Sequence, residues 1–305
     1  MTVAVARLAG AVALSAVGGL TWAVAETRMF TVRTHTVAAL PPGSTPLRVL
    51  HVSDLHLTPG QRLKQEWVRQ LVELEPDLVV STGDNLAHDD AVPSVRRALG
   101  PLLELPGVFV LGSNDYYAPQ AKNPARYLLP SSRRDESTVE AQPLPTDDLV
   151  AVLSSGGWLD LTNARGRLEV AGHHVSFVGV DDPHLDRDRM PPPGDREAFH
   201  VGVTHAPYTR VLDAMHEDGA AMIIAGHTHG GQLRVPGYGA LVTNSDLDTA
   251  RARGLHGWPG PRPDEPGGAG SAWLNVSAGM GTSPYAPVRF ACRPEVSLLQ
   301  LMPRQ

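Results

Sequence analysis

The sequence of 305 residues contains a single cysteine, Cys292, and no excess of basic residues. One cysteine excludes an intramolecular disulfide and excludes zinc sites built from several thiolates. Lysine and arginine total 26 against 32 acidic residues, so the formal net charge is −6 and no basic field attracts nucleic acid. The Gly-x-Ser-x-Gly turn of many serine hydrolases is also missing. We therefore expect neither a nucleic-acid partner nor a cysteine or serine nucleophile.

The N-terminal region carries a run of uncharged residues, Leu8–Ala25, between Arg7 and Glu26. A membrane-spanning helix needs roughly 17–25 apolar residues, so the run predicts a membrane-anchored protein with its anchor in residues 1–28. Arginines on both sides of the run leave the orientation open. Two alternatives remain: a cleavable signal ending near Ala25, which would give a secreted form, and a buried core helix.

Apolar runs alternate with helical spacing over most of the remaining chain. Leu47–Val52 and Leu78–Val80 are predicted strands, and residues 61–74 between them place their leucines on one helical face. This alternation is typical of an α/β sheet with reactive groups at the strand ends. We predict one domain over residues 29–305, with a polar surface insertion at residues 130–148.

Five apolar runs each end in side chains that can bind metal. These candidates are Asp54 and His56, Asp84, Asn114, His205, and the pair His227 and His229. Imidazole and carboxylate together favour Zn, Mn or Fe over calcium. Alternate residues of an extended segment point the same way, so Asp54 and His56 are expected to share one ion. Asp84 has two oxygens and can bridge two ions.

Two ions are expected because phosphate-ester hydrolysis needs both a nucleophile at neutral pH and a counter-charge for the transition state. A pair of divalent ions about 3.5–4 Å apart supplies both. Coordination lowers the pKa of a bound water to about 7, so a metal-bound hydroxide forms without a side-chain base.

The motifs resemble those of the calcineurin-like metallophosphoesterase family over about residues 47–301. The Gly-His-Thr-His-Gly-Gly-Gln motif that begins at Gly226, together with the N-terminal hydrophobic helix, is similar to the membrane-anchored bacterial branch. The resemblance implies an α/β fold, a four-layer α/β/β/α sandwich with the metals at one edge of two sheets. It also implies the ligands: Asp54, His56 and His229 for the first ion, Asn114, His205 and His227 for the second, and Asp84 as the bridge.

One loop departs from the family pattern. The family reads Gly-Asn-His followed by Asp or Glu, and this chain reads Gly112-Ser113-Asn114-Asp115. Without a gap, Ser113 takes the place of the ligand Asn and Asn114 that of the catalytic His. With a shift of one residue, Asn114 is the ligand and Asp115 replaces the His. We favour Asn114 as the ligand because an amide oxygen is a better neutral donor than a hydroxyl.

Either alignment removes the histidine that, in the family, is thought to stabilise the transition state or protonate the leaving group. General acid catalysis typically contributes about 10²–10⁴-fold, so catalytic power is the open part of the prediction. We predict Asp84, Asn114 and Asp115 as the catalytic residues, with His88 and Tyr116 as further candidates to replace the histidine.

The predicted function is hydrolysis of a phosphodiester or pyrophosphate bond beside a membrane. The substrate is expected to be a phosphate ester, either lipid-linked or nucleotide-like, because an anchor would place the site near such molecules. The alternative is a metal-binding regulatory protein of the same fold with weakened catalysis, which the missing histidine favours.

Overall fold

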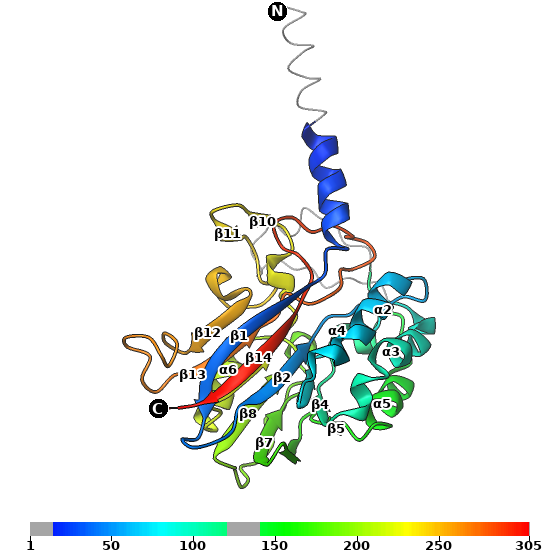
Figure 1. The fold of residues 1–305 in the computed structure, drawn as a ribbon. Coiled ribbons are helices and arrows are strands. Elements are labelled where there is room, and N and C mark those ends of the chain that lie inside the picture. Colours follow the sequence, from blue (N-terminus) through cyan, green and yellow to red (C-terminus); the bar gives the residue numbers. More distant parts are fainter. Residues whose placement is uncertain (1–14, 121–140, 305) are drawn as a thin grey trace, which may run out of the picture.

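The computed structural model describes residues 15–120 and 141–304, and its core is two six-stranded mixed sheets (Figure 1). In spatial order the first sheet contains β1 (Thr31–Leu40), β14 (Glu295–Pro303), β2 (Leu47–Val52), β3 (Leu78–Ser81), β4 (Gly107–Phe109) and β5 (Leu159–Asp160). The second contains β12 (Gly254–Trp258), β13 (Ala272–Val276), β9 (Met222–Ala225), β8 (Phe199–Thr204), β7 (His173–Gly179) and β6 (Arg165–Val170).

Parallel pairing dominates the centre of both sheets. In the first sheet β2, β3, β4 and β5 run parallel, and β14 is antiparallel to β2. In the second sheet β7, β8, β9 and β13 run parallel, and the edge strands β6 and β12 are antiparallel to their neighbours. Parallel strands place their carboxyl ends at one edge of a sheet, where ligand sites form in α/β proteins.

Helices cover the outer faces of the two sheets. They are α2 (Arg62–Arg69), α3 (Val92–Leu99), α4 (Ser113–Tyr116), α5 (Thr146–Ser154) and α6 (Thr209–Glu217). Short 3₁₀ turns are η1 (Gln70–Leu74), η2 (Asp89–Ala91), η3 (Leu102–Glu104), η6 (Pro183–Leu185), η7 (His229–Gly231) and η8 (Thr249–Arg251). A separate hairpin consists of β10 (Arg234–Val235) and β11 (Gly239–Ala240).

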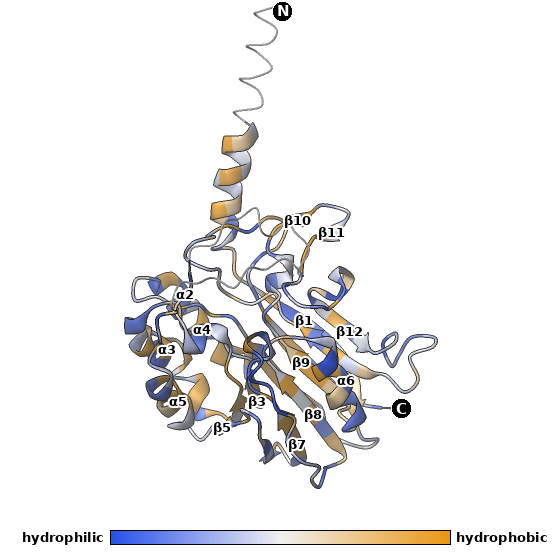
Figure 2. Ribbon diagram, turned by 180° about the vertical axis from the view of Figure 1, so that it is seen from behind, coloured by the Kyte–Doolittle hydropathy of each residue, from blue (hydrophilic) through white to orange (hydrophobic). Residues whose placement is uncertain are grey.

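Three clusters of buried apolar side chains define the layers. One joins α2, α3 and α5 to the first sheet, a second lies between the sheets, and a third joins α6 to the second sheet. Figure 2 shows the hydrophobic colouring along strands such as β8 and β9. Phe177 of β7 is 1% exposed and belongs to the cluster between the sheets. The layers therefore run helix, sheet, sheet, helix, and the predicted α/β class is confirmed.

Several predicted elements appear with small changes in their bounds. The strand Leu47–Val52 is found as predicted, but the helix expected over residues 61–74 is α2 followed by the 3₁₀ turn η1. The left-handed backbone of Glu75, with a φ of 47°, ends that turn. The expected surface insertion at residues 130–148 falls mostly on residues 121–140, which lie outside the described residues.

The N-terminal segment is helical over residues 15–26 and projects from the body (Figure 1). Within the described part of the chain, no helix has both the length and the apolar character needed to cross a bilayer. The predicted anchor also includes residues 1–14, which lie outside the described residues.

Candidate metal centre

The predicted ligands lie on loops at the carboxyl ends of neighbouring parallel strands. Asp54 and His56 follow β2, Asp84 follows β3, His205 follows β8, and His227 follows β9. The first two loops are joined by backbone hydrogen bonds: the amide of Asp54 donates to Gly83 at 2.9 Å and that of His56 to Asp84 at 2.9 Å. The strand order therefore brings separate sequence motifs to one edge of the two sheets.

Left-handed backbone, rather than extended strand, directs these side chains. The φ angles are 51° at Asp54, 41° at His56, 56° at Asp84, 67° at His227 and 48° at His229. The expectation that Asp54 and His56 point the same way within an extended segment is wrong, because β2 ends at Val52. Each left-handed non-glycine residue costs about 1–2 kcal/mol, a cost that concentrates at functional sites.

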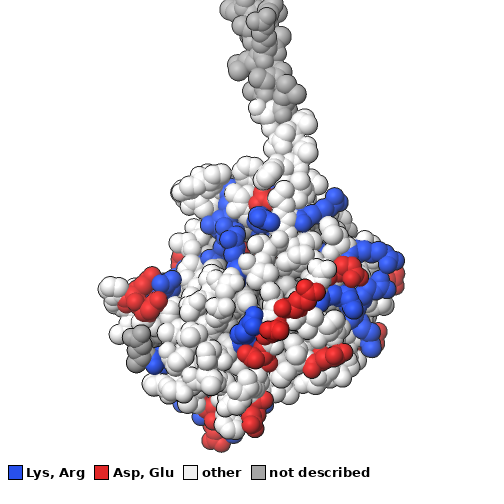
Figure 3. All heavy atoms as spheres, in the orientation of Figure 1, with Lys and Arg blue, Asp and Glu red and all other residues white. Residues whose placement is uncertain are grey.

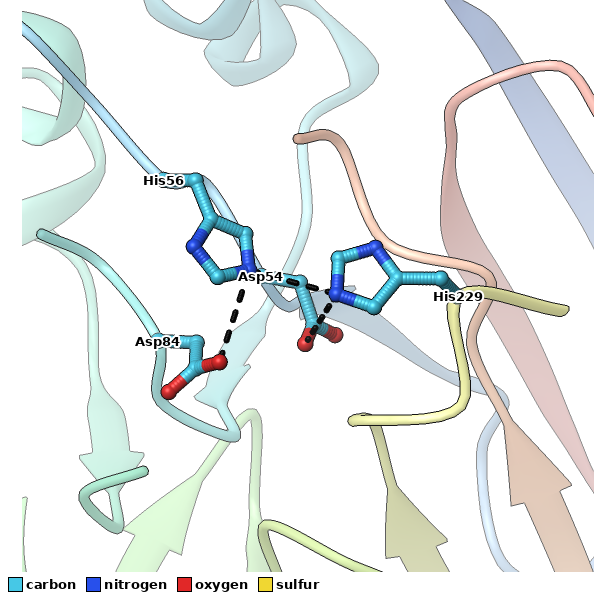
Figure 4. A group of neighbouring side chains, drawn as sticks. All are labelled: Asp54, His56, Asp84 and His229. Carbon is cyan, nitrogen blue, oxygen red and sulfur yellow. Dashed lines mark hydrogen bonds and ion pairs between the residues drawn. The ribbon is translucent and has the colours of Figure 1, made fainter. Parts of the chain in front are cut away.

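Asp54, His56, Asp84 and His229 form one tight cluster in which a ligand atom of each lies within 4.8 Å of the others (Figure 4). The Nε2 atoms of His56 and His229 face each other at 3.2 Å. His56 Nε2 is 3.4 Å from Asp84 Oδ2, and His229 Nε2 is 3.6 Å from Asp54 Oδ1. Three of these residues are buried, and the His229 side chain is 12% exposed.

The two histidines of this cluster are held in the form that binds metal. Burial lowers the pKa of His56 and of His229 well below the usual value, so both rings are neutral at pH 7. His229 Nδ1 lies 3.1 Å from the carbonyl oxygen of Gly281 and 3.4 Å from Arg289 Nη2. An N–H on Nδ1 pairs with the nearer carbonyl, and in that tautomer Nε2 keeps its lone pair for a metal. Neutral imidazole and carboxylate are the ligand forms that divalent cations need.

A second group begins at the other oxygen of Asp84. Asp84 Oδ1 is 3.6 Å from His205 Nε2, whereas Oδ2 faces His56. His205 donates from Nδ1 to the carbonyl of Thr82 at 2.7 Å, and its Nε2 is 3.2 Å from His227 Nδ1. Asp84 therefore faces both groups, as a bridging carboxylate would.

Asp84 and His205 have raised pKa values, so both hold protons that a bound metal ion would displace. Burial raises the pKa of Asp84 to about 8, and the Asp54 carboxylate adds to the rise. Burial alone would lower the pKa of His205, but the carboxylates of Asp84, Asp182 and Asp54 raise it to about 9. Closely spaced buried carboxylates with few cationic partners fit a site for divalent ions.

The loop after β4 is the part of the predicted cage with different contacts. Asn114 donates its backbone N–H to Asp84 Oδ1 at 2.7 Å, while its side-chain amide donates to the carbonyl of Tyr117 at 3.0 Å. Ser113 Oγ donates to Asp182 Oδ2 at 2.5 Å. These hydrogen bonds thus join the two side chains to protein groups other than the histidines. A ligand role for Asn114 stays a prediction.

Asp115 is fully buried and receives backbone N–H groups from three directions. Asp84 and Gly112 donate to Oδ2 at 2.9 and 3.0 Å, and Asn85 donates to Oδ1 at 2.7 Å. These bonds fix the loop after β3 to the loop after β4. The geometry therefore gives Asp115 a positioning role, and a catalytic role for it stays a prediction.

Two basic residues that the sequence did not indicate, Arg289 and Lys64, lie beside the centre and hold its loops. Arg289 is 0% exposed and donates from Nη2 to the carbonyls of Ala278 and Gly281, each at 2.7 Å. Lys64 donates to the carbonyl of Leu55 at 2.8 Å, and burial lowers its pKa to about 7. Neither residue lies in a recognisable motif, so their positions depend on chain folding alone.

A buried hydrogen-bond chain lies beneath Asp54. Asn275 contacts His51 Nδ1 at 2.9 Å, and His51 Nε2 contacts Thr82 Oγ1 at 2.9 Å. Thr82 Oγ1 donates to Ser53 Oγ at 2.7 Å, and Ser53 Oγ donates to Asp54 Oδ2. Burial lowers the pKa of His51 to about 3, so this ring stays neutral and serves as a rigid spacer.

Glycines provide the space in which the loops approach each other. A Cβ on Gly112 would lie 2.5 Å from Asp84 Oδ1 and 2.6 Å from His205 Cε1. A Cβ on Gly226 would collide with Ser53 and lie 2.7 Å from Asp54 Oδ2. The glycine before each of these loops is therefore required by packing at the centre.

Comparisons with known proteins agree with this geometry. Residues 47–231 match the family described as Calcineurin-like phosphoesterase. The chain is 27% identical over 272 residues to the uncharacterized metallophosphoesterase YkoQ of Bacillus subtilis, covering 85% of each protein. It is 24% identical over 273 residues to the phosphodiesterase YaeI of Escherichia coli, covering 88% of this chain and 87% of that one.

Among solved structures, a dimetal phosphatase from Danio rerio aligns with 12% identity and a TM-score of 0.39. The alignment covers 77% of this chain and 88% of that one.

Proposed function

Because the chain belongs to the calcineurin-like phosphoesterase family, we propose that it hydrolyses a phosphodiester or pyrophosphate bond with the help of two divalent ions. Members of the family are hydrolases that act on phosphoric esters, and they typically use two divalent metal ions. The observation that carries the proposal is the position of Asp84, whose two oxygens face His56 and His205 at 3.4 and 3.6 Å.

The donor set fits two ions of the Zn, Mn or Fe kind. Asp54, His56 and His229 would hold the first, and His205 and His227 the second, with Asp84 shared. When bound, such ions supply a nucleophile at neutral pH and offset charge in the transition state. The protein orients two of the rings through backbone carbonyls: Nδ1 of His229 lies 3.1 Å from the carbonyl of Gly281, and Nδ1 of His205 lies 2.7 Å from that of Thr82. Nε2 of each of these two rings therefore faces the carboxylates of the centre.

Tyr116 and Arg187 are proposed to orient the substrate phosphate ester beside the second group of ligands, His205 and His227. The Tyr116 hydroxyl donates to Asp181 Oδ1 at 2.8 Å, and the Arg187 guanidinium lies 3.9 Å above the Tyr116 ring. Arg187 also donates to Asp181 at 3.0 Å. Burial raises the pKa of Tyr116, so its proton is retained at neutral pH. Arg187 offers positive charge for the substrate phosphate.

We also propose a diester or pyrophosphate substrate that is lipid-linked or nucleotide-like. The name of YaeI, a phosphodiesterase, supports a diester. The exposed side chains of Leu20 and Trp22 on the N-terminal helix support a site beside a membrane. Asn114 has no titratable proton, which favours substrates whose leaving group departs without protonation.

The test uses the full chain purified and loaded with Mn²⁺. It should hydrolyse bis(p-nitrophenyl) phosphate faster than p-nitrophenyl phosphate. His229→Ala should lose metal and activity together, whereas His174→Ala, at an exposed position on β7, should match the parent. Unchanged turnover in His229→Ala would rule out this centre.

A regulatory protein with weak catalysis is the second candidate. Its support is the contact between the Asn114 side chain and Tyr117, in a loop where the family has its histidine. Ser113→Asn combined with Asn114→His separates the two candidates. A gain of about 100-fold or more would favour the regulatory candidate, because general acid catalysis is worth about 10²–10⁴-fold. A small change would favour the enzyme.

A further inference from the structure

Exposed hydrophobic side chains gather on and around the β10–β11 hairpin. Leu233 is 49% exposed, Val235 44%, Tyr238 75% and Leu241 48%. The hairpin has two residues in each strand, so it buries little of its own surface. Several large apolar side chains exposed within one short segment are unusual on a protein surface and favour an interaction site there.

The hairpin and the N-terminal helix lie at the same end of the molecule (Figure 1). Phe290 and Ala291 connect the helix to the hairpin. The backbone amide of Ala291 donates to Glu26 Oε2 at the end of the helix at 3.0 Å, and the amide of Arg234 in β10 donates to the carbonyl of Phe290 at 2.9 Å. The helix adds further exposed apolar side chains, namely Val17, Leu20, Trp22 and Val24. Helix and hairpin therefore present hydrophobic residues in the same region.

A basic cavity opens beside these residues. It has a volume of about 390 Å³ and is lined by Arg234, Arg253, Val235 and Tyr238, with no acidic residue in its lining. Burial and the charge of Arg253 lower the pKa of Arg234, so the two cations repel each other. Figure 3 shows Lys and Arg side chains gathered just below the point where the N-terminal helix joins the body.

The two guanidinium groups keep donors available for an anion. Arg234 uses Nη1 for the carbonyl of Gly230 at 2.8 Å. Arg253 Nη1 lies 3.9 Å from Glu295 Oε2 and 3.7 Å from Cys292 Sγ, which are long contacts. Guanidinium groups offer five N–H donors each and suit phosphate oxygens.

We propose that this surface, consisting of Leu233–Leu241 and Arg253, docks on an anionic lipid membrane. The apolar tip with Tyr238 enters the interface, and Arg234 and Arg253 bind headgroup phosphates. A tyrosine at the tip and arginines behind it match the polarity gradient of a bilayer surface. The charge pattern selects a phosphate-bearing lipid rather than an acidic protein, because apolar side chains surround the cations.

Docking would bring the metal centre to the lipid surface. His229 begins η7, which ends at Gly231, two residues before Leu233. The proposal does not rest on catalysis, since lipid contact is measured without turnover.

The experiment places an environment-sensitive fluorophore at position 238 of the full chain through Tyr238→Cys. Cys292 is buried and out of reach of the reagent. Vesicles of phosphatidylglycerol or phosphatidylcholine carry brominated acyl chains that quench the probe only on contact. The matched control is His174→Cys, at the exposed second residue of β7.

The probe at 238 should be quenched on phosphatidylglycerol vesicles, and the probe at 174 should not. Arg234→Glu with Arg253→Glu should lower the docking equilibrium constant about tenfold or more, while Arg167→Glu on β6 should not. Equal quenching at both positions, or no effect of the arginine changes, would overturn the proposal. So would a response to inorganic phosphate alone without lipid quenching, which would assign the cavity to a soluble anion. Concentration-dependent self-association without quenching would assign the surface to a second copy.

Discussion

Metal binding should be strongly linked to pH through Asp84 and His205. These side chains lie 3.6 Å apart, with pKa values of about 8 and about 9 before an ion binds. A group with a pKa one unit above the pH is roughly 90% protonated, and a ligand must lose its proton before it binds metal. Binding therefore competes with protons below pH 8.

The expected magnitude follows from the number of protons held. At pH 7 the pair should release between about one and two protons when the ions bind. The logarithm of the Mn²⁺ affinity should rise by about one to two units per pH unit between pH 6 and pH 8. Above about pH 10 both groups have lost their protons, and the dependence should flatten.

Isothermal titration in two buffers of different ionisation enthalpy measures the released protons directly. His229→Ala should weaken binding by at least about 100-fold, since even the loss of an outer partner of a ligand costs about 10–100-fold. His174→Ala serves as the control, because this exposed residue of β7 belongs to neither group of possible metal ligands in the described part of the chain. Binding without proton release at pH 7, or an affinity independent of pH from 6 to 8, would refute the reasoning.

Three further predictions concern packing and buried charge. Gly226→Ala should weaken Mn²⁺ binding because its Cβ would collide with Ser53 and approach Asp54, whereas Gly60→Ala, with open space, should not; calorimetric titration compares them. Phe177→Ala should lower the free energy of unfolding by about 3–5 kcal/mol in a urea titration, since it opens a cavity between the sheets. Lys64 has a folded pKa of about 7 against 10.5, so the unfolded chain binds more protons between these values. Its contribution should therefore make stability rise by about 1.4 kcal/mol per pH unit from pH 7 to pH 10, and Lys64→Met should remove that slope in denaturant titrations.

The sequence was a good guide to what lies at the ends of strands. Apolar runs such as Leu47–Val52 became strands with the predicted bounds, because burial on both faces leaves a continuous hydrophobic signal. The positions of the motifs also predicted that Asp54, Asp84 and His229 would lie close together, and the structure places them in one cluster, since parallel strands bring their carboxyl ends together. Residue type and position relative to a strand were sufficient for this part.

Backbone conformation at the ligands was beyond the sequence pattern. Asp54 and His56 were expected to share a face of an extended segment, and both are left-handed instead. Non-glycine residues rarely take this conformation, and the contacts that hold it come from distant loops such as the one containing Gly83. No local propensity reports such contacts.

The loop from Gly112 to Asp115 shows the same division. Its departure from the family motif was visible in the sequence, and residue chemistry favoured Asn114 over Ser113 as the ligand. In the structure the Asp115 carboxylate accepts hydrogen bonds from the backbone N–H groups of Asp84 and Asn85. The Asn114 side-chain amide donates to the carbonyl of Tyr117. The outcome depends on which groups lie nearby after folding, since a carboxylate and an amide accept many partners.

What the sequence alone determined was the α/β class and a set of metal-binding residue types at strand ends. Hydrophobic periodicity and side-chain chemistry are local properties, so they can be read from the chain. Only the tertiary structure placed Arg289 and Lys64 beneath the centre, paired Ser113 with Asp182, and joined the N-terminal helix to the β10–β11 hairpin. These are contacts between residues far apart in the chain, and they form because packing of the two sheets brings the segments together.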